Sequence, residues 1–418
     1  MKIKKLVAML VCLAAAVLCL ASCEPPIGDY LKDYDYKPDP VYNVTLDFYI
    51  ICDDANTDDM AKSTVNEKIN QVLGDRLKYD TKLNIIYLSE ANYEKQLKVD
   101  LGMLKENDAE ADTVGIYKNT TKLPTGYTYG GKIVLIKDSS MLSYLGDKLA
   151  DLAPYLATTD FGTLNTQING PLLAAADIDG KKLAIPNNRV YGEYQYVCIN
   201  RAKAENILNF SALSEILDIK TPDDVEVLLN AYAKHLNKSR AELTEADVDS
   251  IVRYTNGQYD VKGLINAGNY VGPDTRGVIR DYKKDSNNNW MCNVMVYPTA
   301  TLDVAYESAF GVIPSANLMG KDKDGNDIVA VDYAYRAMQI IYSFNDDVEM
   351  KNLLCYGVPN TNYRMENDVV EPLTEQGSNY KMDHKYCGDV FKSYYSAEWT
   401  KKMAESGKNQ VKEAVLSE

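Results

Sequence analysis

Hydrogen-bonding and aromatic side chains stand at the ends of several apolar runs in this sequence. The candidates are, in chain order, Asp54, Asn56, Tyr117, Asn119, Asn188, Arg189, Tyr191, Glu193, Trp290, Tyr297 and Trp399. Carboxylate, amide and guanidinium groups hydrogen-bond to hydroxyl groups, and aromatic rings can stack on the apolar face of a sugar ring. Together these residue types are suited to reversible binding of a small polar ligand.

Each candidate also fits a structural role when it is taken alone. Asp54, Asn56 and Asn119 occur in turn-forming stretches, where polar side chains are commonly solvated. An aromatic residue such as Tyr191 or Trp290 can equally pack in a core. The binding prediction therefore depends on whether the fold brings the candidates together.

Arrangements of residues that would support catalysis are missing from the sequence. The two histidines, His235 and His384, are far apart, and there is no H-E-x-x-H pair and no G-x-S-x-G turn. Asp53 and Asp54 are adjacent and would point to opposite faces of a strand, while Glu193 has no evident partner. We therefore expect no catalytic residues, no metal site and no cofactor, and a binding protein in place of an enzyme.

The N-terminus has the pattern of an export signal followed by a lipid-attachment cysteine. A basic head with three lysines precedes the apolar run Leu6–Leu20, which is too short for a stable membrane span. The run ends in Leu20-Ala21-Ser22-Cys23, which resembles the lipobox of bacterial lipoproteins and implies cleavage before Cys23 and its diacylation. We expect residues 1–22 to be the signal peptide. Residues 23–43, with four prolines among acidic and tyrosine residues, should be an exposed tether.

Charge and cysteine content narrow the choice of partners. The formal net charge is −15 at pH 7, which disfavours nucleic acid and anionic membrane surfaces. No second long apolar run follows Cys23, so we expect no bilayer-spanning segment. The cysteines after the leader are Cys52, Cys198, Cys292, Cys355 and Cys387. Most of them resemble small buried hydrophobes; one disulfide is possible, and the sequence does not assign it.

The candidates are carried by an alternation of predicted strands and helices. These elements are the strand Val44–Cys52, the helix Thr57–Leu73, the strand Leu83–Leu88, a second helix through Leu104 and the strand Thr113–Tyr117. Such a βαβαβ order predicts a parallel sheet with helices on its faces, and ligands bind beyond the carboxyl ends of such strands. The four candidates from Asp54 to Asn119 occupy those ends. Gly126–Lys137 is predicted to be an inserted hairpin.

Leu183–Asn200 is the stretch on which the predicted domain organisation depends. Its two apolar pieces are separated by the polar break Asn187–Glu193, so they cannot be one continuous strand. We interpret the break as the point where the chain leaves one lobe and enters another, and the strand Trp290–Tyr297 as the return. The first lobe would comprise 44–187 and 298–345, and the second 188–297 and 346–418. An ordinary connection inside one larger domain is the alternative.

Two segments resemble a known protein family. Leu149–Arg201 contains DLAPYL, a DGKKLAIP turn and a strand that ends in Asn200-Arg201, and Arg336–Gln410 contains an LLCYG element followed by an Asn-Tyr turn. Both segments resemble the extracellular solute-binding proteins of family 1. The chain departs from the usual family pattern at Ala153, where Thr is common, and at Arg201, where Lys is common.

This resemblance implies a fold class and a function. The fold would be α/β, a two-lobed periplasmic-binding-protein-like structure with a hinge between two mixed, mostly parallel sheets flanked by helices. The protein would be a monomeric, lipid-anchored receptor on the outer face of the cytoplasmic membrane, which passes a sugar or oligosaccharide to the permease subunits of an ABC importer. A receptor for a peptide or other organic solute, and a surface sensor or adhesin without an importer, are the alternatives.

The lipid anchor is directly testable. Cys23→Ala removes the sulfur to which the lipid would be attached, so cells expressing this variant should incorporate no labelled palmitate into the protein, whereas the wild type should be labelled. Cys19→Ala changes a cysteine on the leader side of the cleavage point and should leave labelling intact. A wild type without labelled palmitate would contradict the anchor.

Overall fold

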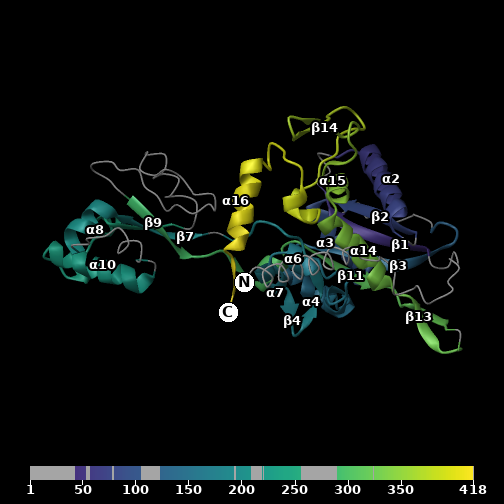
Figure 1. Cartoon of the computed structure of the whole chain (residues 1–418), viewed down its shortest axis with the longest axis horizontal. Coiled ribbons are helices and arrows are strands. Elements are labelled where there is room, and N and C mark those ends of the chain that lie inside the picture. Colours follow the sequence, from purple (N-terminus) through teal and green to yellow (C-terminus); the bar gives the residue numbers. More distant parts are fainter. Residues whose placement is uncertain are drawn as a thin grey trace, which may run out of the picture.

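The computed structural model describes residues 43–52, 57–77, 80–104, 123–192, 194–208, 219, 221–255, 290–322 and 324–417. These residues form a larger and a smaller body, which lie on either side of helix α16 (Lys401–Lys412) (Figure 1). No helix in the described ranges is both long and apolar enough to cross a membrane.

The larger body is built around one five-stranded sheet. Its strands are β1 (Asn43–Ile51), β2 (Thr81–Leu88), β3 (Tyr127–Ile136), β6 (Ala184–Pro186) and β11 (Ala309–Pro314), and its longer helices are α2 (Asp59–Arg76), α3 (Glu90–Asp100), α14 (Tyr333–Asp346) and α15 (Val348–Tyr356). The shorter helices are η4 (Ser139–Met141), α4 (Leu142–Leu145), η5 (Gly146–Lys148), α5 (Ala153–Leu156), α6 (Leu164–Gln167), α7 (Gly170–Ala175), α13 (Leu302–Tyr306), η7 (His384–Tyr386) and η8 (Val390–Lys392). The two-stranded ribbons are β4 (Asp177–Ile178) with β5 (Lys181–Lys182), β12 (Leu318–Lys321) with β13 (Asp327–Val331), and β14 (Tyr363–Glu366) with β15 (Val369–Pro372).

The strand order in this sheet is β2-β1-β3-β11-β6. β1 pairs in parallel with both β2 and β3, whereas β11 is antiparallel to both β3 and β6. Because β11 is antiparallel to both of its neighbours, β6 runs in the same direction as β3 and therefore as β1. The carboxyl ends of β2, β1, β3 and β6 therefore meet at one edge of the sheet, which is also where β11 begins. We call it the carboxyl edge.

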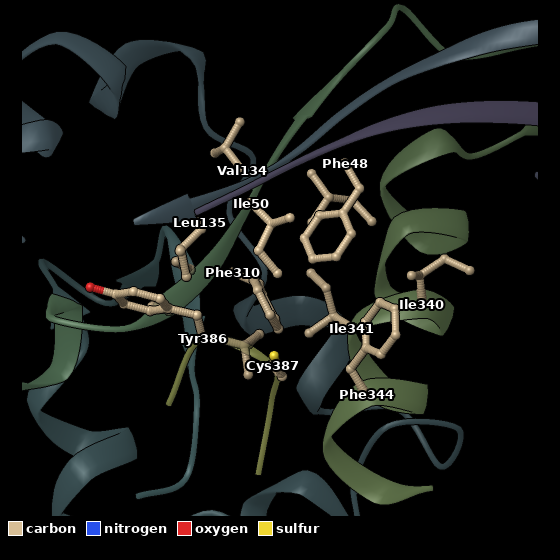
Figure 2. Packing of buried hydrophobic residues seen from close by; sticks show 14 of the residues in the cluster. Phe48, Ile50, Val134, Leu135, Phe310, Ile340, Ile341, Phe344, Tyr386 and Cys387 are labelled. Atoms are coloured by element: carbon tan, nitrogen blue, oxygen red, sulfur yellow. The ribbon is translucent and has the colours of Figure 1, made fainter. Parts of the chain in front are cut away.

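Apolar residues from the sheet and from α14 form the centre of the core. Phe48 of β1 stacks on Phe344 of α14 with ring centroids 5.5 Å apart, and Phe310 of β11 meets Phe48 edge-on at 5.3 Å (Figure 2). All three side chains are fully or almost fully buried. The period of the buried residues in α2, which include Ala61 and Val65, places one helical face on this core. Side-chain burial, more than helix propensity, thus holds the helices on the sheet.

The smaller body has its own sheet and its own core. Its elements are β7 (Gln195–Asn200), α8 (Arg201–Leu208), α10 (Pro222–His235), η6 (Arg240–Glu242), α11 (Glu245–Asp249), β8 (Val252–Thr255) and β9 (Trp290–Val296). The strand order is β8-β7-β9, with both pairs antiparallel. Its core includes Val197, Ile199, Val225 and Leu228 and is separate from the core of the larger body.

A disulfide bond stiffens the smaller sheet. Cys198 of β7 is disulfide-bonded, and Cys292 is the residue directly opposite it in β9. The sequence allowed one disulfide without assigning it, and Cys198 takes part in such a bond. Cys52, Cys355 and Cys387 are buried thiols that form no disulfide.

The α/β fold class is confirmed, with three corrections in detail. Tyr127–Ile136, predicted as a hairpin, is the central parallel strand β3; the predicted strand Thr113–Tyr117 lies outside the described residues. The smaller sheet is antiparallel where it is described, not mostly parallel. The assignment of 346–418 to the second lobe is wrong for 348–387, because α15 and the segment through Cys387 pack into the core of the larger body.

Gly131 allows β3 to pass close to β11. It has φ +114°, follows a register shift between β1 and β3, and a Cβ on it would meet the Ile313 carbonyl oxygen. Gly131→Ala should therefore lower the free energy of unfolding by about 2 kcal/mol or more in urea denaturation. Gly146→Ala, where a Cβ meets nothing within 4 Å, should change stability by less than about 1 kcal/mol. Equal losses in both variants would contradict the close approach.

Candidate ligand site at the carboxyl edge

A C-terminal segment is laid across the carboxyl edge of the main sheet. We call residues 377–399 the edge segment. Thr57, just beyond β1, donates its hydroxyl proton to the Lys381 carbonyl (3.1 Å), and the Gly377 N–H donates to the Asp58 carboxylate (2.8 Å). At the other end of the sheet, Ser308 donates to the Lys385 carbonyl (2.6 Å). The edge segment therefore joins the loops that follow β1 to the start of β11.

The first passage to the smaller body begins with two buried asparagines. The Asn187 N–H donates to the Ser308 carbonyl (2.9 Å), and its side-chain amide donates to the Ser308 hydroxyl (2.9 Å). Asn188 accepts from the Asn169 N–H (3.2 Å) and donates to the Gln167 carbonyl (3.0 Å) and to Asp389 (3.3 Å). Burial raises the pKa of Asp389, against the hydrogen bonds that it accepts. These bonds fix the direction in which the chain leaves β6.

Arg189 and Tyr191 continue this passage with their polar ends turned into the larger body. The Arg189 guanidinium is buried, donates to the Val304 carbonyl (2.6 Å), and forms an ion pair with Glu307 (2.9 Å). Burial lowers the pKa of Arg189, and the charge of Glu307 opposes that shift. The Tyr191 hydroxyl donates to the Asn169 side chain (2.6 Å). The polar ends of Arg189 and Tyr191 thus have partners within the larger body.

The return passage is bound to the first passage through the C-terminus. The Val415 N–H donates to the Pro298 carbonyl (2.9 Å), and β16 (Val415–Leu416) pairs in parallel with β10 (Thr299–Ala300). From α16, Gln410 donates to the Gly192 carbonyl (2.6 Å) in the first passage. The rings of Tyr194 and Tyr297, one from each passage, meet edge-on at 6.2 Å. Three chain segments therefore run side by side between the two bodies. They are the first passage from Asn187 to Gly192, the return passage at Tyr297 and Pro298, and the C-terminal stretch from Gln410 to Val415; we call them the hinge.

Trp399 lies at the end of the edge segment, directly before α16. Its indole is buried and lies 5.2 Å from the His384 ring and 6.0 Å from the Phe391 ring. Its Nε1 is buried without a hydrogen-bond partner among the described residues. Burial lowers the pKa of His384, while Asp383 acts against this and Lys351 adds to it. His384 is therefore held toward its neutral form next to the indole.

A polar groove opens at the far end of the carboxyl edge, between the start of α2 and the start of α3. It has a volume of about 770 Å³ and is lined by Thr57, Asp58, Asp59, Lys62, Ser63, Asn66, Asn84, Ile85, Tyr87, Leu88, Ser89 and Asn92. β2 is the outermost strand of this sheet among the described residues. The Leu88 carbonyl accepts from the N–H of Cys52, directly after β1, so by alternation the N–H and C=O groups of Ile85 and Tyr87 face away from β1. Side-chain amides and hydroxyls, together with backbone groups that face away from β1, suit a ligand rich in hydroxyl groups.

The structure describes only some of the predicted site residues. Asp54, Asn56, Tyr117, Asn119 and Glu193 lie outside the described residues, as does the side chain of Trp290. Asn188, Arg189 and Tyr191 lie together in the first passage, where they serve the hinge. Tyr297 is exposed in the return passage, and Trp399 is buried beside the hinge. A ligand contact by any of them stays a prediction.

Sequence reasoning missed four residues that hold the hinge together, namely Asn187, Ser308, Asp389 and Gln410. Asn187 was visible as part of an Asn-Asn doublet in the polar break. The other three come from segments far along the chain, and no local pattern indicates that they meet Asn187 or Gly192. The positions of β11 and the edge segment bring Ser308 and Asp389 there, and the position of α16 brings Gln410 there.

The pKa of His384 predicts how stability depends on pH. Because its folded-state pKa lies below the usual 6.5, the unfolded chain takes up the proton first as pH falls. The stability that His384 contributes is fully present above about pH 6.5 and is lost as pH falls toward the folded-state pKa, with a slope of at most about 1.4 kcal/mol per pH unit.

His384→Gln should therefore reduce the loss of unfolding free energy between pH 7 and pH 5, measured by urea denaturation. The matched control is His235→Gln, which changes an exposed residue at the end of α10 and should leave the pH dependence unchanged. An unaltered slope in His384→Gln would show that the unfolded and folded states protonate this imidazole alike.

Comparison with known proteins gives likenesses at the level of structure. No protein-family model matches the chain, and neither does any curated protein sequence. The N-glycan transport solute binding protein (NgtS) from Streptococcus pneumoniae is 14% identical, with a TM-score of 0.47 over 90% of this chain and 84% of that one. The same protein in complex with Man1GlcNAc gives 0.46 over the same shares.

A further similar structure is the ABC substrate-binding protein Lmo0181 from Listeria monocytogenes in complex with cycloalternan. It is 11% identical, with a TM-score of 0.31 over 90% of this chain and 88% of that one. The solved structures to which the chain is similar thus include solute-binding and ABC substrate-binding proteins. At such low identities and TM-scores, the ligands named here are those of the other proteins.

Proposed function

We propose that this protein is an extracytoplasmic solute receptor that binds a sugar or oligosaccharide between its two bodies and delivers it to an ABC importer. The observation that carries the proposal is the hinge. The chain passes from the carboxyl edge of the main sheet to a separately packed body and back, and α16 and β16 bind both passages. Two rigid bodies joined by a few parallel segments are the arrangement that closes around a ligand.

The energetics of this arrangement favour motion at the hinge over deformation of either body. Each body has its own buried core, and the smaller sheet carries a disulfide, so both resist distortion. A ligand that contacts both bodies would stabilise the closed arrangement by its differential affinity for it. The importer would then distinguish the ligand-bound receptor from the empty one by the closed arrangement of its two bodies.

The chemistry around the carboxyl edge supports a ligand with many hydroxyl groups. The polar groove supplies side-chain amides from Asn66, Asn84 and Asn92 together with hydroxyl and carboxylate groups. Tyr297, exposed in the return passage, offers a ring for stacking. A peptide or other organic solute would use the same backbone groups but would need more apolar pockets for its side chains.

The location and partners follow from the N-terminal sequence. An export signal that ends in a lipid-attachment cysteine would place the receptor on the outer face of the cytoplasmic membrane, held by the tether 23–43. The permease subunits of an importer would be its protein partners, and it would act as a monomer without cofactor or catalysis.

A glycan panel in a thermal-shift screen tests the function. A true ligand at 100-fold its Kd should stabilise the protein by about 2.7 kcal/mol, and small-angle scattering should show a smaller radius of gyration with the ligand than without it. The ligand should be recovered unchanged by mass spectrometry after prolonged incubation. Glycerol, a polyhydroxyl compound without ring structure, is the control and should cause no compaction.

Other outcomes would identify the alternatives. Tight binding with an unchanged radius of gyration would contradict closure and favour a surface sensor or adhesin. Stabilisation by a peptide library and by no glycan would replace the sugar with a peptide. A new product formed from the bound glycan would overturn the receptor in favour of an enzyme.

A further inference from the structure

Two free cysteines meet in the core between α15 and the edge segment. Cys355 and Cys387 are both completely buried, and their thiols lie within hydrogen-bonding reach of each other. Cys387 lies within the core near Phe310 (Figure 2). Neither thiol takes part in the hinge contacts or in the groove described above, so the proposed function gives the pair no role.

The surroundings hold both sulfur atoms at one point of the edge segment. The Cys387 sulfur lies 3.3 Å from the Asp383 carbonyl oxygen, and the Cys355 sulfur lies 3.9 Å from the Met382 carbonyl oxygen. The Met382 N–H donates back to the Cys355 carbonyl (3.0 Å). The two sulfur atoms thus contact the carbonyl oxygens of two consecutive residues, Met382 and Asp383, and this keeps the sulfur atoms close together.

The two thiols differ in their tendency to ionise. Lys351 lies one helical turn before Cys355, is fully buried, and donates to the His384 carbonyl (2.6 Å). Burial opposes ionisation of Cys355, but the hydrogen bond with Cys387 and the charge of Lys351 outweigh it and lower its pKa. Burial raises the pKa of Cys387 well above its usual value. While the core is closed, Cys355 is therefore the thiol that ionises more readily, and Cys387 is the one that keeps its proton.

We propose that Cys355 and Cys387 form a dithiol modification site that is converted to a disulfide by exchange with a small-molecule or protein disulfide. The Cys355 thiolate attacks one sulfur of the incoming disulfide, which releases the first thiol and leaves a mixed disulfide. The Cys387 sulfur then attacks Cys355, the Cys355–Cys387 bond forms, and the second thiol is released. The two electrons and the two thiol protons of the protein pass to the incoming disulfide, which becomes two thiols.

The bond would fasten the edge segment to α15. The same segment supplies the Lys385 carbonyl to Ser308 and the Asp389 carboxylate to Asn188, so it supports the start of both passages of the hinge. Because both thiols are fully buried, exchange requires that the edge segment be unfolded or opened. The cysteine pair would thus become a disulfide or stay a dithiol during folding, and it would keep that state in the folded protein.

Oxidative refolding of the full chain tests the proposal. The reduced, denatured protein is refolded in a buffer of oxidised and reduced glutathione, remaining thiols are alkylated in denaturant, and the cysteine-containing peptides are mapped by mass spectrometry. We expect a Cys355–Cys387 cross-link, and alkylation of Cys52, which contacts Thr57 (3.3 Å). The map reports each cysteine separately, so those of the leader do not interfere.

Two results would overturn the proposal. One is alkylation of both Cys355 and Cys387 in protein in which Cys198 has formed its disulfide. The Cys198 disulfide would show that the conditions allow disulfides to form, so the failure would belong to the Cys355–Cys387 pair. The other is a cross-link of either residue to Cys52. As a second measurement, Tm is recorded before and after dithiothreitol is added. The fall in Tm should be several degrees larger for the oxidised wild type than for Cys387→Ala, because the variant cannot form the Cys355–Cys387 bond. Cys52→Ser is the matched control and should keep the full loss. If Cys387→Ala does not fold, the peptide map of the wild type still decides.

Discussion

β11 lies between β3 and β6 and runs antiparallel to both. This single reversal determines where the rest of the molecule is attached. It makes the outgoing strand β6 end, and the incoming strand β11 begin, at the edge where β1, β2 and β3 also end. Had β11 been parallel to its neighbours, the chain would have had to return at the opposite edge, and the two passages would lie a strand length apart. The hinge, the edge segment and the groove all depend on this one strand direction.

The polar residues of the hinge stabilise a specific path more than they stabilise the fold. A buried amide or guanidinium group costs free energy when it leaves water, and hydrogen bonds within the protein largely offset this cost. Asn187, Asn188 and Arg189 are all buried, and each donates to a main-chain carbonyl of another segment. Any other path for this stretch would leave several of these groups unsatisfied. The network therefore disfavours other paths of the chain between the two bodies, and this fixes where the first passage leaves the larger body.

Local patterns in the sequence predicted those elements whose environment is local. β1 and α2 follow from an unbroken apolar run and from a helical period, although α2 continues through the predicted stop at Gly74 to Arg76. β3 was mistaken for a hairpin because Gly130-Gly131 resembles a turn, whereas here the glycines admit a bulge and the close passage of β11. α15 was assigned to the wrong body because an amphipathic helix shows that it has a buried face but not which sheet buries it. The polar break at Asn187 was found, yet its partners Ser308 and Asp389 come from topology alone.

The position of Trp399 gives the protein a built-in optical probe. The chain has two tryptophans, and this one lies between the edge segment and α16, with its ring beside His384 and Phe391. An indole in such a place emits according to the polarity around it and to the charge of the neighbouring imidazole. Any rearrangement that shifts α16 relative to the edge segment changes both. The emission of Trp399 therefore follows the state of the hinge without an attached label, even for ligands that never touch the ring.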